Sequence, residues 1–282
     1  MRFIATGDVG GEVEILNGLL KLDLQKYDFV VFTGDLVGTR ELRKVGEATA
    51  RRLKTDVKID YPDIKNRLDG INRVFVEAKK RTRVYGILGN SDLGTFVSLV
   101  PRMEFESIHD RIVRVGDNFV IGYQGRPMNI DELERSDDVE ESAFFPGRTY
   151  GERAKECNGW PEDKAHADIS RMLATADPRK CVLITHYPPF EILDRVEERN
   201  VPWAIAAYGE RSRHGHIGSQ AFLQVTRESG ILLHVFSHVH ESKGIVRMGN
   251  TTYVNLGSLE DDRDMCEAEI ENDRVQIRFL KV

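Results

Sequence analysis

Acidic, amide and imidazole side chains follow five apolar runs of this 282-residue chain, each where the run ends. They are Asp8, Asp35, Asn90 with Asp92, His186, and His238 with His240. Each one alone fits ordinary turn chemistry or a buried core histidine, but all five ends carry the same kinds of side chain. Oxygen and imidazole ligands without thiolates suit divalent ions such as Mn, Fe(II) and Zn. Because ligands of an open α/β sheet gather at the carboxyl ends of its strands, the pattern predicts one metal site.

The runs that carry these residues predict an α/β fold. β-Prone runs occupy residues 2–6, 29–33 and 84–88, and the segments between them, such as 11–24, have helical period. This alternation is typical of parallel strands joined by crossover helices. Three later stretches each contain two alternating runs joined through a turn, and they predict hairpins at 111–122, 244–255 and 266–280. We therefore expect a second, more antiparallel sheet that faces the first, with helices outside.

Two segments interrupt this pattern. Residues 40–83 are highly charged and mostly helical, and we expect two helices that break near Tyr61 and Pro62. Residues 124–164 have little periodicity and contain the acidic run "ERSDDVEE", so we expect an irregular insertion. No low-complexity linker divides the chain. The expectation is one domain over residues 1–282 with these two insertions.

The composition is that of an ordinary globular protein. Lys and Arg number 40 against 46 Asp and Glu, and the net charge of −6 argues against an extended nucleic acid as partner. No run reaches the roughly 18 apolar residues of a membrane helix, and the chain enters a β-prone run at once. We expect a cytoplasmic protein without membrane attachment. The three cysteines show no paired spacing, so neither a disulfide framework nor a cysteine zinc site is predicted. The oligomeric state is left open.

The ordered set of strand ends resembles the calcineurin-like metallophosphoesterases. Their pattern is Gly-Asp-x-His, Gly-Asp-x-x-Asp or -Asn, Gly-Asn-His-Asp or -Glu, a lone His, and Gly-His-x-His. The likeness runs from about Arg2 to Ser258 and includes "NLGS" near its end. It implies a four-layer α/β/β/α sandwich of two mixed sheets flanked by helices. It also implies a metal-dependent phosphoesterase, with phosphodiesters ahead of monoesters as substrates, as in small prokaryotic phosphodiesterase-type members.

The resemblance also implies a set of metal ligands. One ion would be held by Asp8, Asp35 and His240, and the other by Asp35, Asn90, His186 and His238. The two divalent ions would be Mn, Fe, Ni, Co or Zn, and together they would supply a hydroxide for in-line attack at phosphorus. Asn90 would also reach a phosphate oxygen, and Asp92 would orient a metal-binding imidazole.

Four positions depart from the family pattern. Gly10 stands where the family has a histidine ligand, which leaves a place for water or Glu12, or leaves only one of the two ions bound. Ser91 stands where the family has its proton donor, while Gly38 and Ser237 replace residues that do not bind metal.

The missing proton donor needs a substitute. The candidates for the general acid are His216, His214 and a metal-bound water, of which we favour His216, because it precedes Ser219, a candidate helix cap. The resulting catalytic candidates are Asn90, Asp92 and His216, and the substrate-binding candidates are Asn90 and His214.

Three kinds of function compete on this sequence. The first is hydrolysis of a small phosphate ester or nucleotide, with specificity in residues 124–164 and in the loop 187–214, where Tyr208 and Arg211 are candidate contacts. The second is a catalytically degenerate member of the fold that acts as a binding or scaffold protein, which Gly10 and Ser91 favour. Against it stand the retained ligands, because buried carboxylates and imidazoles are costly without a partner. A DNA nuclease is disfavoured by the acidic balance.

Overall fold

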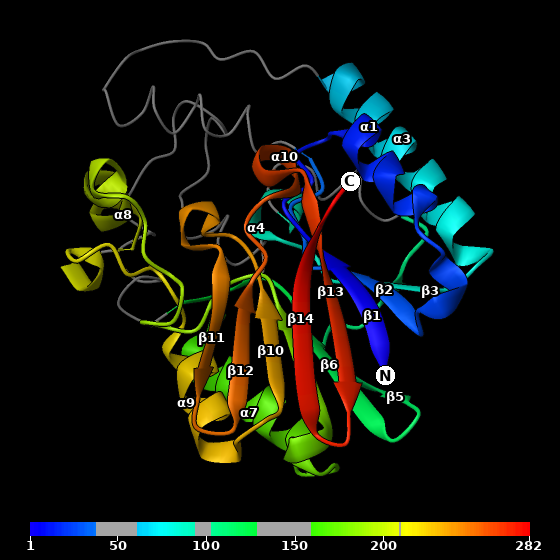
Figure 1. The fold of residues 1–282 in the computed structure, drawn as a ribbon. Helices are drawn as coiled ribbons and strands as arrows, with labels where there is room; N and C mark the ends of the chain where they lie inside the picture. Colours follow the sequence, from blue (N-terminus) through cyan, green and yellow to red (C-terminus); the bar gives the residue numbers. More distant parts are fainter. Residues whose placement is uncertain (38–60, 94–102, 129–158, 209) are drawn as a thin grey trace.

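The computed structural model describes residues 1–37, 61–93, 103–128, 159–208 and 210–282 (Figure 1). Its strands form two mixed six-stranded sheets and a small third sheet. The first sheet contains, in spatial order, β14 (Arg274–Lys281), β13 (Asp264–Glu271), β1 (Arg2–Thr6), β2 (Phe29–Phe32), β3 (Arg83–Gly86) and β4 (Glu106–Ser107). The second contains β11 (Gly244–Met248), β12 (Thr251–Asn255), β10 (Leu233–Phe236), β9 (Cys181–Thr185), β6 (Asn118–Tyr123) and β5 (Arg111–Val115). The third pairs β7 (Arg126–Met128) with β8 (Gly159–Pro161) in parallel.

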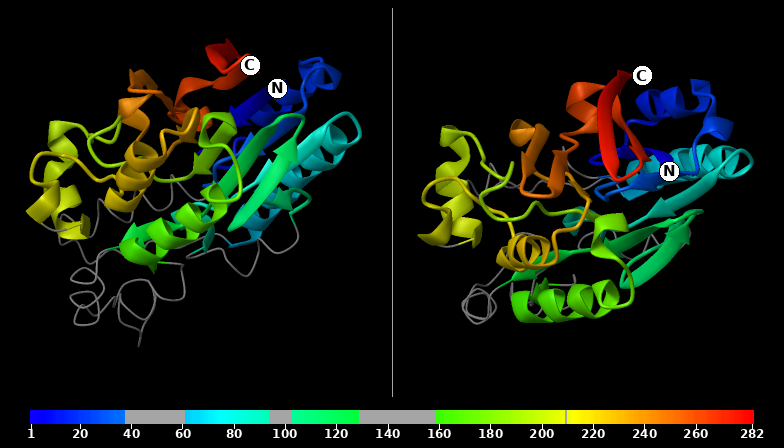
Figure 2. Two further views of the ribbon diagram at one scale, coloured as in Figure 1. Left: turned by 90° about the horizontal axis from the view of Figure 1, so that it is seen from below. Right: turned by 60° about the horizontal axis from the view of Figure 1, so that its bottom comes forward.

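Helices cover the outer faces of both large sheets (Figure 2). On the first sheet they are α1 (Val13–Leu16) and α3 (Tyr61–Lys79), and on the second they are α7 (Glu162–Leu173) and α9 (Gln220–Ser229). The described residues also form α4 (Asn90–Leu93), α8 (Val201–Tyr208) and α10 (Leu259–Asp262). Short 3₁₀ turns span Asn17–Lys21, Leu24–Lys26, Pro178–Lys180, Glu198–Asn200, Glu210–Ser212 and His240–Ser242. Within the described ranges, no helix combines the length and the apolar character that a membrane span needs.

The layers follow from the alternation of side chains along each strand. In β1, Phe3 belongs to the apolar cluster between the two sheets, whereas Ile4 belongs to the cluster under α3. Phe3 stacks on Phe29 of β2 at 4.6 Å between ring centroids, and Phe32 contacts Phe75 of α3 at 4.4 Å. A third cluster joins the outer face of the second sheet to α7 and α9. Each buried large apolar side chain contributes about 1.5–3 kcal/mol, so these clusters hold the four layers together. The predicted α/β/β/α sandwich is confirmed.

All three predicted hairpins form, but one lies in a different sheet from the one expected. The hairpin of β13 and β14 joins the first sheet, because β13 pairs antiparallel with β1, with Arg2 opposite Glu269. In the second sheet, β12, β10, β9 and β6 run parallel, and antiparallel pairing occurs at the two edges, through β11 and β5. The second sheet is therefore mixed, and its centre is parallel rather than antiparallel.

The segments between the strands differ in detail from the sequence expectation. The helix expected over 11–24 is one α-turn followed by 3₁₀ turns. Within this segment, Gly18 packs closely against Val282, since a Cβ at position 18 would lie 2.5 Å from the Cβ of Val282. Helix α3 begins at Tyr61, where a helix break was expected, and the preceding residues 38–60 lie outside the described part of the chain. The ends of the expected irregular insertion are regular, because β7 and β8 pair and α7 begins at Glu162, while residues 129–158 are not described.

Candidate metal centre

The ends of β1, β2, β3, β9 and β10 bring the predicted ligands to one edge, where the two sheets approach each other. β1 and β2 are parallel neighbours, and Asp8 donates its main-chain N–H to Gly34 O at 3.0 Å. Across the gap between the sheets, Thr33 Oγ1 donates to Ser237 Oγ at 2.9 Å. Ser237, which departs from the family pattern, therefore links the two sheets next to the predicted ligand His238.

Three of the predicted ligand residues have a left-handed backbone. The φ angles are +49° for Asp8, +50° for Asp35 and +71° for His238. Such a conformation costs a residue with a side chain about 1–2 kcal/mol, and it is concentrated at functional sites. Each of these residues comes within a few positions of the end of a buried strand. The left-handed residue turns the chain sharply after each strand, which directs a carboxylate or an imidazole toward the common edge.

His186 has the hydrogen bonding of a metal-binding imidazole. Its Nδ1 lies 2.9 Å from Thr33 O, and because a carbonyl oxygen only accepts, Nδ1 carries the proton. In the neutral ring, Nε2 then presents a lone pair toward Asn90 Oδ1 at 3.0 Å and Asp35 Oδ1 at 3.6 Å. His186 is fully buried and Asp35 is 3% exposed. Three acceptors that face one another in a buried place fit a divalent cation.

His238 completes this half of the site. In the part of the chain that the structure describes, Asp35, His186 and His238 form a group whose ligand atoms all lie within 4.8 Å of one another. The hydroxyl of Tyr208, at the end of α8, lies 3.1 Å from Nε2 of His238. The ring of Tyr187 packs against the same imidazole, with 3.8 Å between centroids. Tyr208 is therefore placed to orient the imidazole of His238, a predicted ligand, and its contact with a substrate stays a prediction.

Asp8 and His240 form the other half. His240 Nε2 lies 2.8 Å from Asp8 Oδ1, and His240 Nδ1 lies 2.8 Å from Asp261 Oδ2. Burial alone would raise the pKa of Asp8, but the charge and hydrogen bond of His240 hold that pKa well below its ordinary value. A carboxylate on the far nitrogen of a metal-binding histidine fixes the ring and raises its basicity. Asp261 was missed by the sequence analysis, and the only signal for it is the acidic run that follows Ser258.

Asp92 does not orient an imidazole as predicted. One carboxylate oxygen accepts from Leu36 N at 2.9 Å, and the other accepts from Gly89 N at 3.0 Å. Burial, with the charge of Asp35 added, raises the pKa of Asp92 to about 8 against these amide hydrogen bonds. Asp92 therefore ties together the two loops that carry Asp35 and Asn90.

The candidates for the general acid lie on the loop before α9. His216 Nδ1 is 2.6 Å from Asp194 Oδ1, and Asp194 also accepts from Gly218 N at 2.9 Å. Ser219 caps α9 by accepting from Phe222 N, as the sequence predicted. His214 is exposed on the same loop. Gly38 and the side chain of Ser91 lie outside the described part of the structure.

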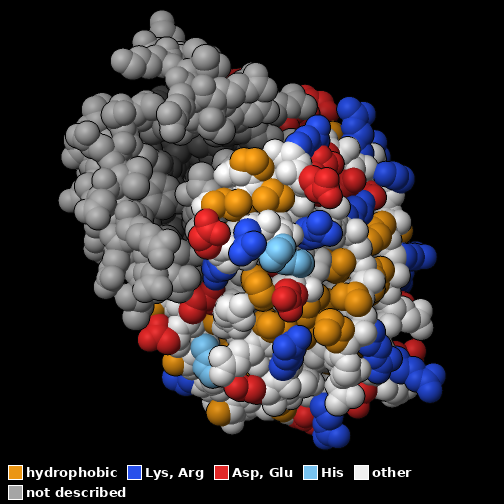
Figure 3. All heavy atoms as spheres, turned by 90° about the vertical axis from the view of Figure 1, so that its left-hand side faces the viewer, with side chains coloured by type: hydrophobic (Ala, Val, Ile, Leu, Met, Phe, Trp, Pro, Cys, Tyr) orange, Lys and Arg blue, Asp and Glu red, His pale blue; other side chains and the backbone are white. Residues whose placement is uncertain are grey.

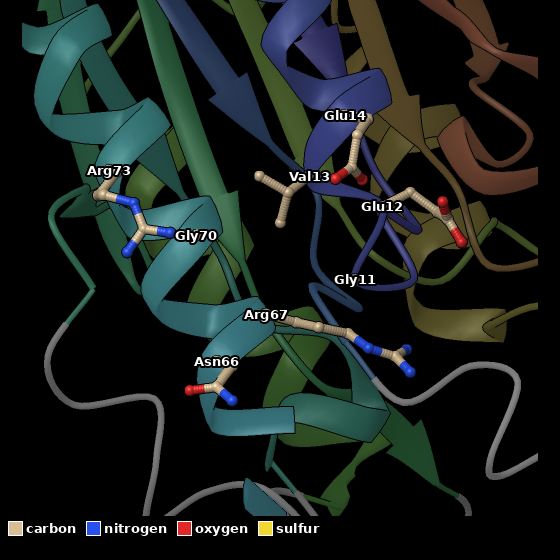
Figure 4. A pocket seen from close by; sticks show the side chains of 8 residues that line it. All are labelled: Gly11, Glu12, Val13, Glu14, Asn66, Arg67, Gly70 and Arg73. Carbon is tan, nitrogen blue, oxygen red and sulfur yellow. The ribbon is translucent and has the colours of Figure 1, made fainter. Parts of the chain in front are cut away.

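Glu12, the candidate to replace the missing histidine ligand, lies just before α1. It lines a pocket between α1 and α3 together with Arg67 and Arg73 (Figure 4). In the close view, the Glu12 and Arg67 side chains extend toward the same side of this pocket.

The comparisons with known proteins agree with this geometry. The sequence matches the family model described as calcineurin-like phosphoesterase over residues 1–242. A dimetal phosphatase from Danio rerio is similar in fold, with a TM-score of 0.61 at 12% identity over 99% of this chain and 95% of that chain. The protein TT1561 of Thermus thermophilus is similar with a TM-score of 0.54 at 12% identity, over 98% and 97% of the two chains. No curated protein matches the sequence.

Proposed function

The chain belongs to the calcineurin-like phosphoesterase family, and from this premise we propose that it hydrolyses phosphodiesters with two divalent metal ions. The observation that carries the proposal is that His186 Nε2 lies near both Asp35 Oδ1 and Asn90 Oδ1. His186 donates its Nδ1 proton to Thr33 O, so Nε2 is the nitrogen that can bind a metal. Oxygen and imidazole donors of this kind suit Mn, Fe, Ni, Co or Zn.

Each ion has its own set of residues in this proposal. Asp8, Asp35 and His240 hold the first ion, while Asp35, Asn90, His186 and His238 hold the second, so that Asp35 serves both. When bound, the ions polarise the phosphoryl oxygens and provide a nucleophile from water at neutral pH.

The protein groups around the ions position the substrate. Asn90 directs its Oδ1 toward His186, which leaves its amide N–H groups to donate to a phosphoryl oxygen. His216, held by Asp194, is the candidate that gives a proton to the leaving group.

Charge and composition support the proposed substrate class. On the face shown in Figure 3, Lys and Arg side chains lie among Asp and Glu side chains rather than in one basic stretch. With a net charge of −6, this arrangement supports a small phosphate ester or a nucleotide as substrate and gives no support for an extended nucleic acid or a membrane surface. We propose a cytoplasmic location.

The test compares the natural sequence with Asp35→Ala and with Asp117→Ala, which changes an exposed carboxylate on the turn between β5 and β6. Each protein is assayed for metal content and for turnover of bis-p-nitrophenyl phosphate with Mn, Ni, Co and Fe(II). Asp35→Ala should lose both metal and activity, by at least about 100-fold in rate, because the ligand common to both ions is gone. Asp117→Ala should behave like the natural sequence. A natural protein that binds none of the ions and turns over no substrate would contradict the proposal and favour the alternative of a binding or scaffold protein.

A further inference from the structure

The side chain of Glu260 lies against Gly10, the position that lacks the imidazole. Gly10 has a φ of +62°, and a Cβ built there would lie 2.3 Å from Oε2 and 2.7 Å from Cδ of Glu260. Real Cβ atoms do not approach other atoms this closely. The carboxyl group of Glu260 therefore stands where a side chain at position 10 would begin.

The backbone holds Glu260 in this place. Ser258 Oγ donates to Asp8 O at 3.1 Å, and the main-chain N–H of Glu260 donates to the same oxygen at 3.3 Å. Leu259 N donates to Gly7 O at 3.1 Å. Helix α10 is thus docked directly on the turn that presents Asp8.

The same helix supplies a partner to a predicted ligand. Asp261, the next residue, accepts from His240 Nδ1, while His240 Nε2 faces Asp8. Glu260 is only 7% exposed, so its charge is largely removed from water and gains from a nearby cation. Helix α10 therefore places one carboxylate against Nδ1 of His240, a predicted ligand, and a second one against Gly10, two residues after Asp8.

We propose that Glu260 is the fourth protein ligand of the first ion and takes the place of the imidazole that Gly10 lacks. The inference rests on the proposed function, because it presupposes that Asp8, Asp35 and His240 bind an ion. The substitution changes the chemistry of the site, since a carboxylate replaces a neutral imidazole and three of the four protein ligands become carboxylates. Such a set favours Mn(II) over Zn(II) relative to a site with two imidazoles.

The main test measures ion binding directly. Protein stripped with EDTA is titrated with MnCl₂, and the bound ions per chain and their affinities are measured by calorimetry and elemental analysis. The natural sequence should bind two ions. Glu260→Gln, which keeps size and removes charge, should weaken one of them at least about 10-fold and leave the other unchanged. Asp117→Ala, an exposed carboxylate far along the chain from the site residues, is the control and should leave both unchanged, and Glu12→Gln tests the rival candidate and should also leave both unchanged.

Each other result has a definite meaning. Unchanged binding of both ions by Glu260→Gln would overturn the inference and leave the proposed function intact, as would loss of the first ion in Glu12→Gln. Absence of bound ions in the natural protein with every metal would overturn the proposed function itself. Circular dichroism of the stripped proteins checks that the variants fold.

A ligand exchange gives a second test that does not depend on Glu260→Gln alone. Gly10→His should lower the affinity for the first ion, because the new side chain meets the Glu260 carboxyl group and must adopt a positive φ. The double variant Gly10→His with Glu260→Gly should regain part of that affinity. If Gly10→His by itself binds the first ion more tightly than the natural sequence, Glu260 is not the ligand.

Discussion

Replacement of Gly89 by alanine should displace the carboxylate of Asp35, which we propose serves both ions. A Cβ at this position would lie 2.1 Å from Asp35 Oδ1 and 2.6 Å from the main-chain nitrogen of Asp35. Real Cβ atoms do not come within 3.0 Å of another atom, so the carboxylate oxygen must move by about 1 Å. Carboxylate oxygens bind Zn-like ions at about 2.0–2.2 Å, and a shift of half that length removes the bond.

The consequences of Gly89→Ala can be separated experimentally. The rate of diester hydrolysis should fall at least about 100-fold, and the number of bound ions should fall with it. The free energy of unfolding, measured in urea with EDTA present, should fall by only about 1–3 kcal/mol, the usual effect of one extra methyl group in a packed region. Measuring both quantities distinguishes loss of the site from loss of the fold.

A matched glycine provides the control. Gly244→Ala places a Cβ at an ordinary 3.5 Å from Leu193 Cδ2, at the start of β11, and should change neither the bound metal nor the rate. If Gly89→Ala keeps the metal content and the rate of the natural protein, then Asp35 Oδ1 does not bind the ions from its position against Gly89.

Three further results are expected. Asp261→Asn should weaken the affinity for the first ion about 10–100-fold, measured by Mn(II) titration, because His240 loses the charge that fixes its ring. Burial lowers the pKa of His234 to about 3 from 6.5, so protonation favours the unfolded chain. The contribution of neutral His234 to the free energy of unfolding is fully present above pH 6.5 and decreases as the pH falls. In urea unfolding, the free energy of unfolding should therefore fall by about 2 kcal/mol between pH 7 and pH 5, and this loss should be absent in His234→Leu. Because Ser91 stands in place of the usual proton donor, aryl phosphodiesters should be hydrolysed faster than alkyl ones in a steady-state assay; equal rates would contradict this.

The sequence was informative where function depends on the residues directly after a strand. Asp8 and Asp35 were predicted as site residues because a glycine and a carboxylate at the end of a β-prone run need no knowledge of distant contacts. The hairpins were predicted for the same reason, since alternation and turn residues are local. The sheet that the last hairpin joins is decided by the pairing of Arg2 with Glu269, and no local pattern encodes such a contact.

The residues that hydrogen-bond to the predicted ligands could hardly be predicted from the sequence. The roles of Tyr208 and Asp261 depend on single hydrogen bonds to His238 and His240 that only the folded chain creates. Asp92 was predicted to orient an imidazole, whereas its partners are main-chain amides, which have no sequence signature. The proximity of Glu260 to Gly10 could not be predicted from the sequence either, because the two residues are distant in the sequence.

The pairing of β1 with β13 also bears on how this protein is made. The amino group of Met1 donates to Ile270 O at 2.8 Å, and β1 lies between β2 and β13 in the first sheet. A ribosome releases β1 long before β13, so the first sheet keeps an open edge for most of synthesis, and such an edge invites aggregation. The segment that closes this edge is preceded directly by α10, which carries Glu260 and Asp261. A chain released prematurely before α10 would therefore lack both the strand that closes this edge and these two carboxylates.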